Sequence, residues 1–157
     1  MNPKIGMKDA DRGAVVDILN TLLADEVVLY VKTRNYHWNV VGSDFGELHK
    51  FFEGQYEKIE DFMDDTAERA RALGGHALGT LVEFQKRSRL KEAPGKYPKA
   101  AVMVADLLAD HEAIVQSLRK DLETSQDKHG DAGTADFLTG LMEEHEKMAW
   151  MLRSYLG

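Results

Sequence analysis

The chain has 157 residues, a formal net charge of −7 at pH 7 and no cysteine. This length suits one domain with a sizeable core, and the absence of thiols excludes disulfides and thiolate metal sites. The acidic balance disfavours a general nucleic-acid-binding surface, because affinity for phosphate depends mainly on cationic contacts. No apolar run reaches the ~18 residues that cross a membrane, and no early run is typical of a signal peptide, so we expect a cytoplasmic protein.

Two long helices are predicted in the first half of the chain. Residues 1–10 form a polar lead that we expect to be flexible. Apolar residues recur at helical spacing from about 11 to 37, and again from about 45 until Gly74-Gly75 ends the second helix. Asp44 and Glu47 form a candidate capping start for that helix. Because only a short turn joins them, the two helices should lie antiparallel.

The connection formed by residues 74–98 is longer than loops without secondary structure usually are in a compact domain. Within it, Thr80 and Glu83 form a candidate capping box for a short helix that reaches about Arg89. Pro94-Gly95 breaks this helix, and Pro98 suits the first position of the next one.

Two further helices are predicted at about 98–127 and 134–156. The first should bury Val102, Ala105, Leu108, Ala109, Ile114 and Leu118, and the second Phe137, Leu138, Leu141, Met148, Met151 and Leu152. The pattern therefore predicts an all-α four-helix bundle with a short extra helix between helices 2 and 3.

The second helix carries a stripe of candidate metal ligands. His49, Glu53, Asp64 and Glu68 fall at about 0°, 40°, 60° and 100° around its axis. Imidazole and carboxylate together suit iron or zinc. The alternative is that the acids form a solvated face and the histidine fills a polar core position.

A single copy of the helix cannot close such a site. Nineteen positions separate His49 from Glu68, which is about 28 Å along a helix, whereas metal–ligand bonds are about 2.0–2.2 Å. The pairs His49/Glu68 and Glu53/Asp64 are symmetric about one midpoint, so two antiparallel copies bring both pairs together. This predicts two equivalent metal sites at a two-fold dimer interface, each completed by His37.

The residues around the stripe carry a longer pattern, His37-Trp38-Asn39-Val40-x-Gly42-x-x-Phe45-x-x-x-His49, then Glu53, then Asp64-x-x-Ala67-Glu68-Arg69. It resembles the signature of the Dps proteins, the DNA-binding proteins from starved cells, which are mini-ferritins. The similarity covers nearly the whole chain, so it implies one ferritin-like domain over 1–157 that assembles as a hollow dodecamer.

The resemblance also implies an iron chemistry. Fe²⁺ would be oxidised to Fe³⁺ at ferroxidase sites that take His37 and His49 from one subunit and Asp64 and Glu68 from its partner. Hydrogen peroxide is the implied oxidant in preference to O₂, and a stored ferric mineral is the implied product. Glu53, where the family often has Asp, would bind iron directly or through water. Trp38 would lie near the iron and intercept oxidising equivalents, or simply pack the dimer contact.

Acidic residues near the last helix connection are candidate pore residues. In the family such acids line three-fold pores that admit Fe²⁺. Asp136 matches them best and Asp127 is the second match, whereas Asp131 is a candidate substitute for Ala132, which stands where relatives often have an acid. The alternative is that they cap and solubilise the turn. Glu57 and Glu60 are candidates for mineral nucleation.

Three remaining groups carry other hypotheses. His111 and His145 are read as helix-surface or packing residues, because no Glu-x-x-His spacing supports a di-iron site within the bundle. The basic run 86–91 either contacts DNA phosphates or forms a solvated face. The alternatives to an iron-storage ferroxidase are a nucleoid-associated DNA-binding protein with secondary iron oxidation, and a purely structural oligomer.

Overall fold

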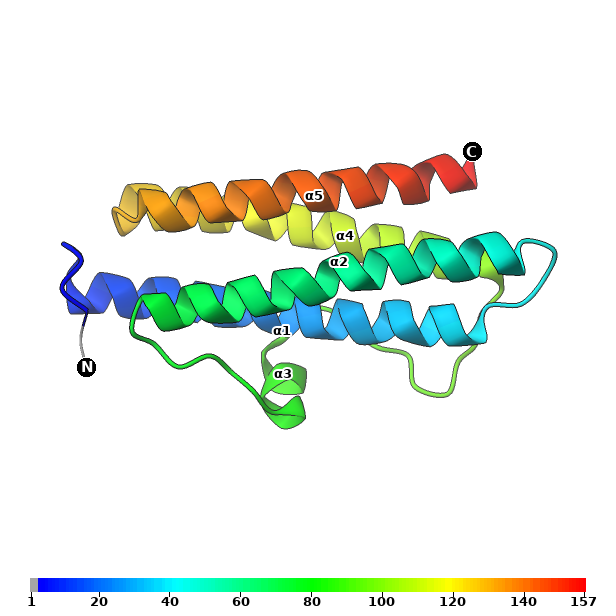
Figure 1. Cartoon of the computed structure of the whole chain (residues 1–157), viewed down its shortest axis with the longest axis horizontal. Helices are drawn as coiled ribbons and strands as arrows, with labels where there is room; N and C mark the ends of the chain where they lie inside the picture. Colours follow the sequence, from blue (N-terminus) through cyan, green and yellow to red (C-terminus); the bar gives the residue numbers. More distant parts are fainter. Residues whose placement is uncertain (1–2) are drawn as a thin grey trace.

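The computed structural model describes residues 3–157, and these form a four-helix bundle without strands. The long helices are α1 (Asp9–Asn39), α2 (Phe45–Ala72), α4 (Ala100–Glu123) and α5 (Ala132–Leu156). A short helix α3 (Leu81–Arg87) lies in the connection between α2 and α4, and a π-helical turn η1 (Thr124–Lys128) extends α4. Helix α1 packs along α2 and α4 along α5, with α3 against α1 outside the bundle (Figure 1). The predicted all-α architecture is confirmed.

The four long helices share one apolar core. Because each helix has apolar residues three and four positions apart, it presents a continuous stripe to its neighbours. The side chains that are essentially fully buried include Leu19, Leu22 and Leu29 of α1, Leu48, Phe52 and Ile59 of α2, Met103, Leu107, Ile114 and Leu118 of α4, and Leu138 and Leu152 of α5. This packing fixes the face that each helix turns outward, and therefore the position of the candidate ligands.

Several predicted boundaries are confirmed, whereas one predicted capping bond and one predicted first residue are wrong. Thr80 and Glu83 form the predicted capping box of α3, and α2 ends before Gly74, whose positive φ of 84° suits glycine. Asp44 makes no capping hydrogen bond through its side chain. Helix α4 begins at Ala100 after Lys99, so Pro98 precedes the helix.

The first helix begins at Asp9, two residues before the predicted start and inside the lead that was expected to be flexible. The first two positions of that lead lie outside the described residues. Pro3 packs close to Gly74, where an added Cβ would meet its Cδ at 2.5 Å. The described part of the lead therefore contacts the end of α2.

The predicted buried face of α4 is partly wrong. Ile114 and Leu118 are buried as expected, but Val102, Ala105 and Ala109 are exposed. The helix buries Met103, Val104 and Leu107 in their place. Apolar residues occupy both faces of this helix, so periodicity alone could not select the inner one.

The basic run 86–91 holds the long connection against the bundle. Arg89 donates to the buried carboxylate of Asp25 at 2.7 Å and reaches Asp121 at 3.4 Å. Arg87 pairs with Asp17 of α1. Arg87 and Arg89, two of the side chains considered as possible DNA contacts, therefore form ion pairs within the chain. Within residues 3–157, no helix is long and apolar enough to cross a membrane.

Candidate metal centre

Two predicted ligands, His37 and His49, lie side by side where α1 ends and α2 begins. Their rings stack with centroids 3.7 Å apart and planes inclined by 22°. The His37 Nδ1 lies 2.7 Å from the carbonyl oxygen of residue 49, and the His49 Nδ1 lies 2.9 Å from the carbonyl oxygen of residue 37. Each imidazole is therefore oriented by the backbone of the other residue.

This reciprocal bonding determines which ring nitrogen can bind a metal. A carbonyl oxygen only accepts, so both Nδ1 atoms carry the proton and donate it. In a neutral imidazole the Nε2 of each ring then has a free lone pair. Metal-binding histidines are commonly oriented by such a hydrogen bond from the second ring nitrogen. The pair thus fits a metal of the kind that imidazole binds.

Glu53 lies one turn beyond His49 on α2 and is partly exposed. Its Oε1 accepts a hydrogen bond of 3.3 Å from the Tyr56 hydroxyl. Burial, and next the Glu53 carboxylate, raise the pKa of Tyr56 above its usual value. The hydroxyl therefore stays protonated at neutral pH and donates to the carboxylate.

The other two predicted ligands, Asp64 and Glu68, lie toward the opposite end of α2, and both are exposed. In the part of the chain that the structure describes, no three histidine or acidic side chains gather closely enough to hold a metal. The fold therefore brings His37 and His49 together, with Glu53 one turn further along α2, and leaves Asp64 and Glu68 toward the other end of that helix.

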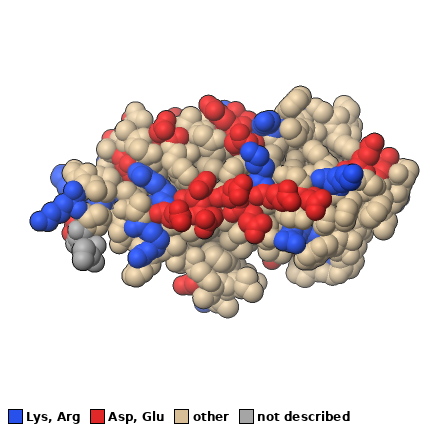
Figure 2. All heavy atoms as spheres, viewed as in Figure 1, with Lys and Arg blue, Asp and Glu red and all other residues tan. Residues whose placement is uncertain are grey.

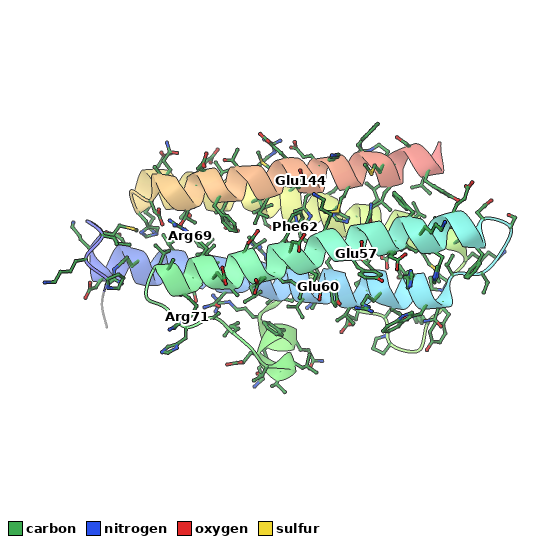
Figure 3. The ribbon with its side chains drawn as sticks, in the orientation of Figure 1. Glu57, Glu60, Phe62, Arg69, Arg71 and Glu144 are labelled. Carbon is green, nitrogen blue, oxygen red and sulfur yellow. The ribbon has the colours of Figure 1, made fainter. Side chains whose placement is uncertain are left out.

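The face that carries Asp64 is strongly acidic. Figure 2 shows a band of carboxylates along the middle of the face on which α2 lies. The exposed acids of this helix are Glu47, Glu57, Glu60, Asp61, Asp64, Asp65 and Glu68. Glu57 and Glu60 project from the middle of α2 (Figure 3). Such a surface attracts cations.

A groove of about 890 Å³ adjoins this acidic face. Its lining combines apolar residues of α1 and α3 with acids of α2, among them Asp64: Leu23, Val27, Tyr30, Val31, Leu81, Phe84, Glu60, Asp61, Asp64 and Asp65. Leu81 and Val82 of α3 are 77% and 59% exposed. Large apolar side chains left open beside a groove are typical of a protein–protein contact.

Trp38 lies next to His37 at the end of α1 and is 64% exposed. The Arg34 guanidinium lies 5.4 Å from its ring centre, within cation–π range. The indole therefore packs on an arginine beside the histidine pair, which is compatible with both of its predicted roles.

The three candidate pore acids differ in their surroundings. Asp127 and Asp136 are exposed, whereas Asp131 is buried. Asp131 caps α5, since its Oδ1 accepts from the Thr134 amide at 2.9 Å, and it pairs with Arg69 at 3.1 Å. Arg69 lies at the end of α2 beside the start of α5 (Figure 3). Asp131 therefore has the capping role that was the alternative to lining a pore.

His111 and His145 lie in the bundle interior, fully buried, so the helix-surface alternative is wrong. Their Nδ1 atoms share a hydrogen bond of 2.9 Å, and His145 Nε2 donates to Glu26 Oε1 at 2.7 Å. Burial, and next His145, lower the pKa of His111 well below 6.5. These residues form a polar network that joins α1, α4 and α5.

Comparison with known proteins identifies the class of fold. The family model described as a ferritin-like domain matches residues 16–157. Together with the bundle and the histidine–carboxylate set, this match defines a ferritin-like protein.

Individual relatives identify the family within this class. A low temperature-induced protein of Nostoc sp., described as uncharacterized, is 49% identical over 97% of this chain and 85% of its own length. DNA protection during starvation protein 2 of Bacillus anthracis is 38% identical over 91% of this chain and 97% of its own. The chain also aligns with the crystal structure of a Dps protein from Vibrio cholerae O1, with a TM-score of 0.93 and 30% identity over 100% of this chain and 98% of that one. That protein is described as a member of a broad superfamily of ferritin-like diiron-carboxylate proteins. The chain belongs to the Dps family.

Sequence reasoning missed the residues that surround the predicted ligands. Tyr56 and Arg34 contact one another beside His37, and Glu26 anchors the interior histidines. The spacing of Glu53 and Tyr56, three residues apart on a helix, was a usable signal. Contacts between α1 and the other helices leave no such signal in the sequence, because they depend on the packing register.

Proposed function

We propose that this protein oxidises Fe²⁺ at two equivalent sites between two-fold-related copies and stores the ferric product inside a hollow dodecamer. The observation that carries the proposal is the placement of ligands on α2. His37 and His49 offer oriented Nε2 atoms at its start, whereas Asp64 and Glu68 are exposed toward its other end. An antiparallel copy supplies the missing half of each site.

The groove beside Asp64 supports this mode of pairing. Its apolar walls and the open side chains of Leu81 and Val82 would be covered by a second α2 and α3. Removal of apolar surface from water favours such a contact by about 25 cal/mol per Å² before the entropic costs of association are subtracted. The same contact carries Asp64 and Glu68 toward the partner's histidines.

Fe²⁺ is the substrate of the proposed reaction. Mixed nitrogen and oxygen ligation that leaves open positions allows an oxidant to reach the metal. One hydrogen peroxide molecule takes one electron from each of two Fe²⁺ ions and, with two protons, is reduced to two water molecules. Hydrolysis of the two ferric ions then releases protons. Exposed Asp127 and Asp136 would line the route by which Fe²⁺ enters. In the cytoplasm this reaction removes Fe²⁺ and peroxide together.

The test is Fe²⁺ oxidation with peroxide, and in parallel with O₂, by the parent and by His37→Ala/His49→Ala. We expect the double variant to lose at least tenfold in rate at limiting Fe²⁺, since even outer partners of ligands are worth about 10–100-fold in metal affinity. His76→Ala, which removes a histidine away from the pair, is the matched control. Equal rates in all three proteins would remove the ferroxidase hypothesis.

Assembly is tested separately. Light scattering of the purified protein should give twelve times the chain mass of 17.7 kDa, with iron retained in the same fraction after oxidation. A dimer that oxidises iron but retains none would contradict the storage part of the proposal.

A nucleoid-associated DNA-binding protein is the second candidate, favoured by names such as DNA protection during starvation among the relatives. The formal charge of −7 and the internal ion pairs of Arg87 and Arg89 weigh against it. Gel retardation of linear DNA at physiological salt would support this candidate, and we expect none.

A further inference from the structure

Tyr56 lies against two of the proposed iron ligands at once. Its hydroxyl donates to Glu53 Oε1 at 3.3 Å. Its ring meets the His37 ring edge-on, with centroids 5.2 Å apart and planes at 81°. The side chain is 8% exposed. Tyr56 is therefore a buried neighbour of the histidine pair whose only polar atom points to a candidate ligand.

Residues of α1 hold the Tyr56 ring in place. The Arg34 guanidinium lies 4.6 Å from its centre, and the Tyr30 ring packs edge-on at 6.0 Å. Arg34 in turn donates to the Tyr30 hydroxyl at 2.5 Å. With His37 on another side, the ring is confined by three neighbours from one helix. The position of the Tyr56 hydroxyl is thus set by packing and does not depend on a bound metal.

The Glu53 carboxylate has two oxygens, and the Tyr56 hydroxyl donates a hydrogen bond to one of them. Oε1 is held by the hydroxyl, which leaves the lone pairs of Oε2 for a cation. Metal-bound carboxylates are commonly oriented by such outer hydrogen bonds.

Resting on the proposed iron oxidation, we propose that Tyr56 is a positioning residue that fixes Glu53 as a direct iron ligand through Oε2. Tyr56 itself does not touch the iron. Its contribution is to remove the rotational freedom of a carboxylate that would otherwise bind iron in several orientations or through water. The hydroxyl, rather than the bulk of the ring, carries this effect.

The decisive variant is Tyr56→Phe, which keeps the ring and its contacts and deletes only the hydroxyl. We expect the dissociation constant of Co²⁺, a non-oxidisable probe titrated without oxygen, to rise about tenfold. The KM for Fe²⁺ should rise by a similar factor, with kcat changed by less than about threefold. Tyr155→Phe, the same substitution on α5, is the control and should match the parent. Unchanged circular dichroism and oligomer mass exclude misfolding.

A double-mutant cycle asks whether Tyr56 acts through Glu53. In a Glu53→Ala background the hydroxyl has no carboxylate to orient, so adding Tyr56→Phe should change Co²⁺ affinity by less than about twofold. A full effect of Tyr56→Phe in that background would overturn the proposal, because Tyr56 would then act by another route.

The outcomes separate this proposal from the proposed function. If Tyr56→Phe matches the parent while His37→Ala/His49→Ala loses activity, the ferroxidase stands and the role of Tyr56 is overturned. If the histidine variant also matches the parent, the ferroxidase itself is wrong. A tenfold loss in Tyr56→Phe that disappears without Glu53 is the result expected here.

Discussion

His37 and His49 each donate a ring hydrogen to the backbone carbonyl of the other, at 2.7 and 2.9 Å. These hydrogen bonds run from side chain to backbone, so the orientation that they give each ring does not require the other residue to be a histidine. The end of α1 and the start of α2 thereby form one rigid unit that presents two Nε2 atoms.

This relationship predicts nearly additive effects of the two histidines. His37→Phe keeps the carbonyl of residue 37, so His49 remains oriented, and the reverse holds for His49→Phe. Each single variant should weaken Co²⁺ binding about tenfold or more, and the double variant by close to the product of the two losses. Anaerobic Co²⁺ titration measures this. A single variant as impaired as the double one would show that the two histidines act as one unit.

The capping role of Asp131 predicts a contrast with Asp136. Asp131→Ala removes the cap of α5 and the ion pair to Arg69, and should lower the free energy of unfolding by about 1–3 kcal/mol. Asp136→Ala alters an exposed acid and should change it by less than about 0.5 kcal/mol. Denaturant unfolding measures both.

The same two variants test iron entry. If Asp136 lines the pore, Asp136→Ala slows Fe²⁺ uptake at low concentration and leaves stability unchanged. Slower uptake in Asp131→Ala at full stability would instead assign Asp131 to the pore.

The buried His111 predicts that stability falls in mild acid. In the unfolded chain its imidazole takes up a proton near pH 6.5, whereas burial and His145 hold the folded pKa well below that value. The unfolded state therefore binds the extra proton as the pH falls. Stability is fully present above about pH 6.5 and is lost below it by about 1.4 kcal/mol per pH unit for this group.

Unfolding in urea at several values between pH 5 and 7 measures this dependence, and His111→Phe should flatten it by that slope. An unchanged slope in His111→Phe would mean that another group takes up the proton.

The sequence predicted the bundle, because helices follow from short-range periodicity; the candidate ligands of α2 share one stripe for the same reason and remain a prediction. Apolar spacing gave the long helices, and Thr80 with Glu83 gave the start of α3. Apolar spacing did not predict which face of α4 is buried, because Val102 and Met103 are both apolar and only tertiary packing selects between them.

The surroundings of the ligands were harder to predict. Arg34 on α1 meets Tyr56 on α2 through the register of two antiparallel helices, which no local pattern encodes. The same is true of Glu26, His145 and His111, which come from three helices. Asp131 could have been read from its spacing to Thr134, but its ion pair with Arg69 joins distant positions.

In the proposed iron site, His37 and His49 come from one chain, and Asp64 and Glu68 come from another. Mixing two inactive proteins, His37→Ala/His49→Ala and Asp64→Ala/Glu68→Ala, that are dissociated and reassembled together, tests this division of the ligands. A mixed two-fold pair holds one site with both halves intact and one with neither.

Measured as peroxide-dependent Fe²⁺ oxidation, random reassembly should restore roughly a quarter of the parent rate, because about half of the pairs are mixed and each has one working site of two. Each variant reassembled alone should stay inactive. A mixture as inactive as its components would rule out sites shared between chains, since the ligands would then have to come from a single chain.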